Sequence, residues 1–161
     1  MVDDSSPDGT WKVVQEKLRR KRKGLASAIE DGIKIASGDI FVWMDCDFSH
    51  PPKLLPRLVK MLDKYDIAIA SRFIEGGGQN YSPIRDSTTK LFNFLARLVL
   101  DPRVTDYTSG YIAIKRNIYE KVPVRPIIES LGYVTQYGEY FISLIYRALR
   151  KELKVIEVPY V

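Results

Sequence analysis

Two aspartates one residue apart, Asp45 and Asp47, have the residue type and position needed to bind a metal. They follow residues 40–44, a short apolar run rich in β-forming side chains. Open α/β sheets bind ligands at the carboxyl ends of their strands, so the pair is placed to hold Mg²⁺ or Mn²⁺, with water and nucleotide phosphates completing the coordination. A turn or helix-capping role is the alternative, since Ser49 precedes Pro51 and could cap the next helix.

A cluster of basic residues precedes Gly24. Such a cluster would attract phosphates, anionic lipid head groups or nucleic acid, and a solvated helix end is the alternative. No nucleic-acid-binding motif or basic-aromatic interleaving accompanies it, so we expect no nucleic-acid partner. The cluster consists of Lys17, Arg19, Arg20, Lys21, Arg22 and Lys23.

Two further features have weaker chemical meaning. His50 is the single histidine, and its position next to Pro51 favours a structural or capping role over that of a base. The triple glycine at 76–78 predicts a mobile loop. No Gly-Lys-Ser/Thr follows it, so it is not a phosphate-binding Walker loop, and a lid on the acceptor side is the better interpretation.

The elements that must position these residues alternate between strand and helix, which predicts an α/β layered fold. The apolar pattern predicts a buried parallel strand at 40–44 and further strands at 66–71, 111–114 and 154–159. It predicts helices at 25–36, 52–62, 88–100, 117–121 and 136–149.

Composition indicates one globular domain spanning residues 1–161, with 45% apolar and 28% charged residues. The single cysteine, Cys46, excludes an internal disulfide. The sequence shows neither a secretory signal nor a long apolar run, so we expect a cytoplasmic protein without a membrane span of its own.

The sequence also resembles a known family. Residues 44–52 resemble the Asp-x-Asp signature of family 2 glycosyltransferases, in the dolichyl-phosphate mannose synthase branch. Further blocks match in the same order, at residues 2–10, 23–28 with 36–39, 71–73 and 106–111. The resemblance spans nearly the whole chain, and five ordered blocks are far more specific than any one of them.

This resemblance implies a GT-A fold, a Rossmann-like three-layer α/β/α sandwich that binds a nucleoside-diphosphate sugar. The implied reaction transfers a hexose, with inversion, to dolichyl or another polyprenyl phosphate. The implied donor is GDP-mannose, with UDP-glucose as the alternative. Such an enzyme would make peripheral contact with the cytosolic face of a membrane.

The resemblance also implies roles for single residues. Asp47 would be the main metal ligand, Asp45 would meet the metal or the ribose, and Ser49 would offer a third oxygen. Asp3 and Asp4 would accept hydrogen bonds from the base or ribose, although the same residues are ordinary turn formers.

Two arginines, Arg72 and Arg85, match positions at which the family holds phosphates. A guanidinium can do this with two parallel hydrogen bonds, and surface salt bridges are the alternative. A phosphate acceptor is already ionised at neutral pH, so the reaction needs no strong general base, and the metal and arginines would stabilise the departing diphosphate.

The sequence departs from the family pattern in three places. It has no counterpart of the family's first strand, it is short between Thr10 and Gly24, and the basic segment expected after Val161 is absent. We therefore expect a truncated domain with an exposed strand edge, which a partner chain, an oligomer or a compensating rearrangement would cover. The alternatives are a non-catalytic or partner-dependent subunit that binds nucleotide sugar and, less favoured, a nucleotidyltransferase.

Overall fold

The computed structural model describes residues 24–47, 49–78, 83–124 and 139–161, with the backbone alone for 83–86. The chain divides into two compact units, residues 1–37 with 123–140 and residues 38–122 with 141–161. In the first unit, the described residues form helix α2, Leu25–Ile35, close to the bounds predicted from the apolar pattern. The Ser27 hydroxyl donates to the Gly24 carbonyl at 2.8 Å in the first turn of this helix.

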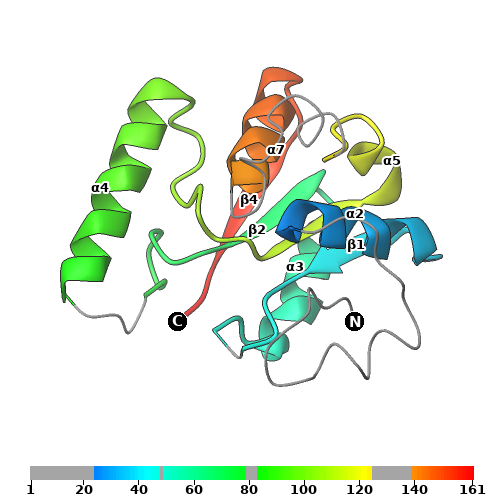
Figure 1. Cartoon of the computed structure of the whole chain (residues 1–161), viewed down its shortest axis with the longest axis horizontal. Helices are drawn as coiled ribbons and strands as arrows, with labels where there is room; N and C mark the ends of the chain where they lie inside the picture. Colours follow the sequence, from blue (N-terminus) through cyan, green and yellow to red (C-terminus); the bar gives the residue numbers. More distant parts are fainter. Residues whose placement is uncertain (1–23, 48, 79–82, 125–138) are drawn as a thin grey trace. The chain divides into compact units, whose positions relative to one another are not determined.

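The second unit contains a four-stranded sheet (Figure 1). Its strands are β1 Ile40–Trp43, β2 Ile67–Ser71, β3 Ile112–Lys115 and β4 Val155–Pro159, in the order β1-β3-β2-β4. Strand β4 pairs parallel with β2, whereas β3 pairs antiparallel with both β1 and β2. The four predicted strands are confirmed.

One expectation about this sheet is wrong. The apolar run at 40–44 was expected to pair as a parallel strand, but among the described residues β1 pairs only with antiparallel β3. The reason is topological, because β3 is inserted between β1 and β2. Strands β1, β2 and β4 still run in one direction, so their carboxyl ends lie at the same edge of the sheet.

The helices of this unit follow the predicted order. A short 3-10 turn, Pro52–Leu54, leads into α3, Leu55–Met61. The others are α4 Pro83–Val99, α5 Arg116–Tyr119 and α7 Glu139–Arg150. Helix α4 begins five residues earlier than the apolar pattern predicted, at a proline, which fits the first turn of a helix because its missing N–H has no partner there.

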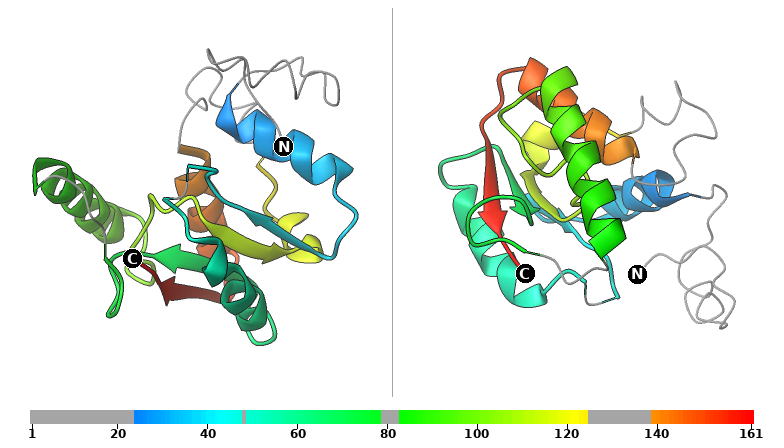
Figure 2. Two further views of the ribbon diagram at one scale, coloured as in Figure 1. Left: turned by 90° about the horizontal axis from the view of Figure 1, so that it is seen from below. Right: turned by 90° about the vertical axis from the view of Figure 1, so that its left-hand side faces the viewer.

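The core of the second unit lies on both faces of the sheet. On one face, Leu58 and Leu62 of the α3 region pack with Ala68, Ala70 and Ala113, whose small side chains leave room for the helix. Strand alternation turns the other side chains to the opposite face, where Ile67, Ile69, Ile112 and Ile114 are fully buried. Helix α7 lies on that side (Figure 2) and buries Leu144, Ile145 and Ala148.

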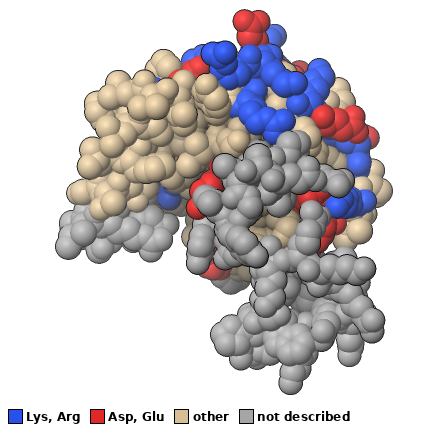
Figure 3. All heavy atoms as spheres, turned by 45° about the horizontal axis from the view of Figure 1, so that its top comes forward, with Lys and Arg blue, Asp and Glu red and all other residues tan. Residues whose placement is uncertain are grey.

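Helix α4 contacts the rest of its unit through a narrow face. Asn93 and Ala96 are buried, whereas six large apolar side chains are exposed: Leu91, Phe92, Phe94, Leu95, Leu98 and Val99. On the face drawn in Figure 3, the part of the surface that α4 forms, at the left, is mostly uncharged, although Lys90 and Arg97 are exposed on this helix. Within the described part of the chain, no helix combines the length and the apolar character needed to cross a bilayer.

Candidate functional site

The predicted carboxylate pair lies directly after β1. Strand β1 ends at Trp43, and the next residues turn out of the sheet at its carboxyl edge. The Asp45 side chain is 55% exposed, and Asp47 is also exposed. Both carboxylates are therefore accessible to a ligand from solvent.

Ser49 holds the carboxylate of Asp47 rather than capping the following helix. Asp47 Oδ1 accepts hydrogen bonds from the Ser49 N–H at 3.0 Å and from the Ser49 hydroxyl at 2.6 Å. These bonds lower the pKa of Asp47, the hydroxyl contributing most, so the carboxylate is ionised at neutral pH. The 3-10 turn beyond Pro51 has no side-chain cap bond. The segment therefore forms a turn, which was the alternative interpretation of the sequence, and it also exposes both carboxylates.

His50 is buried against the same turn, in agreement with its predicted structural role. Its Nδ1 atom accepts the backbone N–H of Asp45 at 2.9 Å. The ring stacks on Tyr111, with centroids 5.0 Å apart, and meets the edge of Tyr160 at 5.9 Å. Burial is the largest influence on the pKa of His50 and lowers it, which favours the neutral ring.

Arg72 stands at the carboxyl end of β2, as predicted, but its guanidinium is engaged within the protein. Its Nε atom donates to Asp106 Oδ2 and its Nη2 atom to Asp106 Oδ1, each at 2.9 Å. Nη2 also donates to Thr108 Oγ1 at 2.9 Å. Arg72 thus forms a salt bridge, the alternative role considered for it. The salt bridge is buried rather than on the surface, since the Arg72 side chain is 9% exposed and that of Asp106 0%.

A polar network continues from Asp106 to distant parts of the chain. The Glu157 carboxylate on β4 accepts the backbone N–H groups of Thr105 and Asp106, each at 2.9 Å. Asn93 on α4 accepts the Tyr107 N–H at 2.7 Å and donates to Thr108 Oγ1 at 3.0 Å. The sequence marked residues 106–111 as a motif, but nothing in it identified Asn93 and Glu157 as partners of that motif.

The structure brings some predicted site residues to one sheet edge. Asp45, Asp47 and Ser49 share one turn after β1, and Arg72 directly follows β2, whose carboxyl end lies at the same edge. Asp3, Asp4, the basic cluster at 17–23 and the side chain of Arg85 lie outside the described residues. The backbone of Arg85 belongs to the first turn of α4.

The two carboxylates would need additional ligands to enclose a cation. Across the described ranges, no three His, Cys, Asp or Glu side chains converge on a common point. A hollow of about 590 Å³ does exist, but Asp39, Ile40 and Glu120 are among its lining residues, which places it at the amino end of β1, away from the carboxylates. An exposed carboxylate pair of this kind fits a metal held jointly with a phosphate ligand.

Two curated proteins align with almost the whole chain. It is 36% identical over 175 residues to the dolichol-phosphate mannosyltransferase of Pyrococcus furiosus, and 34% identical over 175 residues to the polyprenol monophosphomannose synthase of Mycolicibacterium smegmatis. Each alignment covers 99% of this chain, but 46% of the first relative and 64% of the second. The chain thus spans about half to two thirds of their length.

Solved structures share the fold. A glucosyl-3-phosphoglycerate synthase from Mycobacterium tuberculosis, crystallised with Mn²⁺, UDP and glucosyl-3-phosphoglycerate, superposes with a TM-score of 0.66 at 20% identity, covering 98% of this chain and 57% of that one. A second crystal structure of that enzyme, in complex with phosphoglyceric acid, superposes with a TM-score of 0.65 at 23% identity, covering 98% of this chain and 56% of that one. The GT-A fold that the resemblance implied is confirmed. The model of the family described as "Glycosyl transferase family 2" matches residues 1–123, and the chain belongs to that family.

Proposed function

We propose that this chain forms the donor-binding part of an inverting transferase that moves a hexose, mannose from GDP-mannose, onto dolichyl or another polyprenyl phosphate. The two curated relatives are named for transfer of mannose to such lipids. The observation that carries the proposal is the exposed pair Asp45 and Asp47 at the carboxyl end of β1, the edge at which α/β sheets bind ligands.

The carboxylate turn suits Mg²⁺ or Mn²⁺. Asp47 would be the main ligand because it is ionised and its Oδ2 atom lies opposite the oxygen that Ser49 binds. Asp45 would meet the metal or the ribose, and the Ser49 oxygen keeps lone pairs after donating its proton. A bound divalent cation would supply charge that stabilises a departing diphosphate.

The arginines would act on phosphate groups in different ways. Asp106 and Thr108 hold the Arg72 guanidinium in one orientation. A phosphate bound beside Arg72 would therefore meet a positive charge that is already in a fixed position. Arg85 is proposed as the second phosphate ligand, and Asp3 and Asp4 as acceptors for the base or ribose. The lipid phosphate is an anion at neutral pH, so its oxygen can attack without a strong general base.

A peripheral position on the cytosolic face of a membrane is part of the proposal. Helix α4 exposes apolar side chains at helical spacing, Leu91, Leu95 and Leu98 among them, while Lys90 and Arg97 are also exposed on it. A helix with an exposed apolar face and basic residues suits the interface of a bilayer with anionic lipids. The basic cluster at 17–23 would add electrostatic attraction to anionic lipids.

Donor binding is the direct test. Calorimetry with Mn²⁺ should show binding of GDP-mannose in preference to UDP-glucose, and Asp47→Asn should abolish it. Asp63→Asn is the matched control, since Asp63 is an exposed aspartate on a different loop. Failure of the folded wild-type chain to bind either donor would refute the proposed site. Binding without transfer to polyprenyl phosphate would instead favour a non-catalytic or partner-dependent subunit.

Membrane contact is tested separately by sedimentation with vesicles that contain anionic lipid. Leu98→Glu should weaken partitioning because Leu98 is 68% exposed and would lose apolar contact with the lipid. Asn117→Glu, at an exposed position of α5, adds the same charge without removing an apolar group. Equal partitioning of the two variants would contradict a role for α4, and unchanged partitioning after neutralising residues 19–23 would contradict one for the basic cluster.

A further inference from the structure

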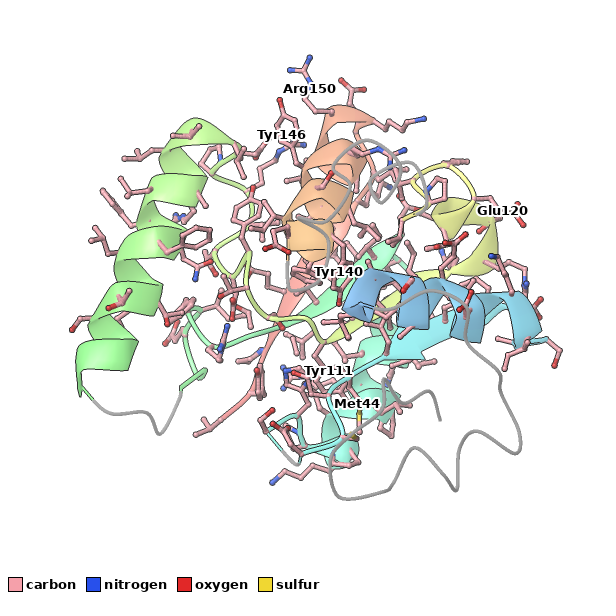
Figure 4. The ribbon with its side chains drawn as sticks, in the orientation of Figure 1. Met44, Tyr111, Glu120, Tyr140, Tyr146 and Arg150 are labelled. Carbon is pink, nitrogen blue, oxygen red and sulfur yellow. The ribbon has the colours of Figure 1, made fainter. Side chains whose placement is uncertain are left out.

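His50 connects the carboxylate turn to the body of the second unit. The residue is 4% exposed, although Asp45 beside it extends into solvent. Its ring lies between Tyr111, which begins the chain into β3, and Tyr160, which follows β4. Tyr111 belongs to the cluster against which Met44 packs, and both are labelled in Figure 4. Met44, just before Asp45, and the His50 ring that holds Asp45 thus both pack against the buried cluster that contains Tyr111.

The contact from His50 to Asp45 requires one particular form of the imidazole. Nδ1 accepts the Asp45 N–H at 2.9 Å, so it cannot carry a proton, and the ring proton must be on Nε2. The same Nδ1 atom is 4.0 Å from Asp45 Oδ2, too far for a hydrogen bond. His50 therefore holds the backbone of Asp45 and leaves its carboxylate available to another ligand.

The two carboxylates are held by different means. Ser49 fixes the side chain of Asp47 with two hydrogen bonds to one oxygen. Asp45 has no comparable bond on its side chain among those the structure records, and His50 fixes its amide instead. Loss of the imidazole acceptor would free the backbone at one carboxylate while the bonds at the other remain.

We propose that His50 is a positioning residue for the carboxylate turn: its Nδ1 atom, seated on Tyr111, holds the Asp45 amide so that Asp45 and Asp47 face one cation together. This inference rests on the proposed function, because it assigns the metal site as the structure that His50 serves. His50 does not touch the reacting groups. Removing a residue that orients a metal ligand typically weakens metal binding by about 10-fold to 100-fold.

Two substitutions separate positioning from general stability. His50→Phe keeps an aromatic ring against Tyr111 but has no acceptor. His50→Asn leaves more empty space, yet its amide oxygen can occupy roughly the place of Nδ1 and accept the same N–H. If His50 only supports packing, His50→Phe should bind metal better than His50→Asn, because phenylalanine preserves the packing better. If His50 positions Asp45, His50→Asn should bind metal better, because asparagine keeps the acceptor.

The experiment measures Mn²⁺ affinity by calorimetry in the presence of GDP-mannose, alongside the thermal midpoint of the whole chain. We expect His50→Phe to weaken Mn²⁺ binding about tenfold or more, and His50→Asn to recover most of that loss although it unfolds at a lower temperature. Tyr111→Phe is the control, since it keeps the stacking ring and removes only a hydroxyl whose bond to the Pro51 carbonyl is 3.4 Å long. Affinities that follow thermal stability would overturn the proposal.

A second measurement does not depend on donor binding. The chain has one histidine, so a long-range ¹H–¹⁵N spectrum of the imidazole reports His50 alone. At pH 7.5 we expect the proton on Nε2 and an Asp45 amide that is protected from exchange in the wild type and exposed in His50→Phe. A proton on Nδ1 would overturn the positioning role even if the metal binds. If the wild type has the proton on Nε2 but binds neither Mn²⁺ nor donor, the proposed function is refuted. The proposed role of His50 at the metal site is then refuted as well.

Discussion

The guanidinium of Arg72 and the carboxylate of Asp106 form a two-point ion pair, with Nε–Oδ2 and Nη2–Oδ1 distances of 2.9 Å each. Asp106 also accepts the backbone N–H groups of Arg72 and Thr108, each at 3.1 Å. One carboxylate thus ties the end of β2 to the turn that leads into β3. Because both side chains are almost completely buried, neither charge could be solvated if the other were removed.

Neutralising Asp106 should therefore be costly. We expect Asp106→Asn to lower the free energy of unfolding by about 3 kcal/mol or more, because Arg72 would keep a buried charge without its counterion. Urea denaturation measures this. Asp63→Asn removes an exposed carboxylate and should change stability by no more than about 0.5 kcal/mol. Equal effects of the two substitutions would mean that the ion pair contributes nothing specific.

Asn93 should couple helix α4 to this ion pair. The residue is 2% exposed, and its side chain bonds to both the Tyr107 N–H and the Thr108 hydroxyl. Asn93→Leu leaves the buried Tyr107 N–H without an acceptor, which should cost about 1–3 kcal/mol. Asn93→Asp keeps that acceptor but loses the donor to Thr108. Hydrogen exchange should show a fast Tyr107 amide in the leucine variant only, and fast exchange in both would contradict the assigned acceptor.

The comparison of sequence and structure shows where local patterns are sufficient. Apolar periodicity predicted β2 and α2 within a residue or so, since each depends on its own side chains. It could not predict that β3 is inserted between β1 and β2, because pairing partners are set by contacts across the whole chain. The prediction of a parallel pairing for β1 failed for that reason.

The candidate site was predictable to the same extent. The Asp-x-Asp turn was identified because its chemistry is contained in three consecutive residues. Asn93 and Glu157 were missed because they are ordinary polar residues of a helix and a strand, and only the fold brings them to residues 105–108. Arg72 was identified, but its buried counterion lies 34 positions along the chain.

Gly77 should be intolerant of a side chain. A Cβ atom there would lie 2.7 Å from the Ser71 carbonyl oxygen and 2.9 Å from the carbonyl group of Arg72, all backbone atoms that cannot move independently. Gly77→Ala should therefore shift the end of β2 and destabilise the chain by about 1–3 kcal/mol. The lid role assigned to residues 76–78 stays a prediction, but Gly77 has a packing requirement of its own.

The matched control is Gly32→Ala in helix α2. Apart from the adjacent residues and the backbone of the helix itself, no atom of the described residues lies within 4 Å of the added methyl group. Alanine is also the better helix former, so stability should rise by roughly 0.5–1 kcal/mol. Thermal unfolding of the two variants should give shifts of opposite sign. A Gly77→Ala variant as stable as the wild type would show that the close approach at β2 is readily relieved.

Tyr107 should make the stability of the chain fall at high pH. Its hydroxyl donates to the Asp101 carbonyl at 2.9 Å, and burial raises the pKa of Tyr107 from 10.0 to about 12. A folded-state pKa above the unfolded value means that this contribution is fully present below pH 10 and is lost as the pH rises towards 12. A shift of this size corresponds to about 3 kcal/mol at most.

Tyr107→Phe isolates that contribution. The variant lacks the ionisable hydroxyl, so the difference in free energy of unfolding between wild type and variant should be constant from pH 7 to about pH 9.5 and shrink above pH 10. Subtracting the variant removes the effect of the other tyrosines and of the lysines, which titrate in both proteins. Urea denaturation at a series of pH values measures the difference. If it stayed constant up to pH 12, the Tyr107 hydroxyl would ionise as readily in the folded chain as in the unfolded one, and burial would not shift its pKa.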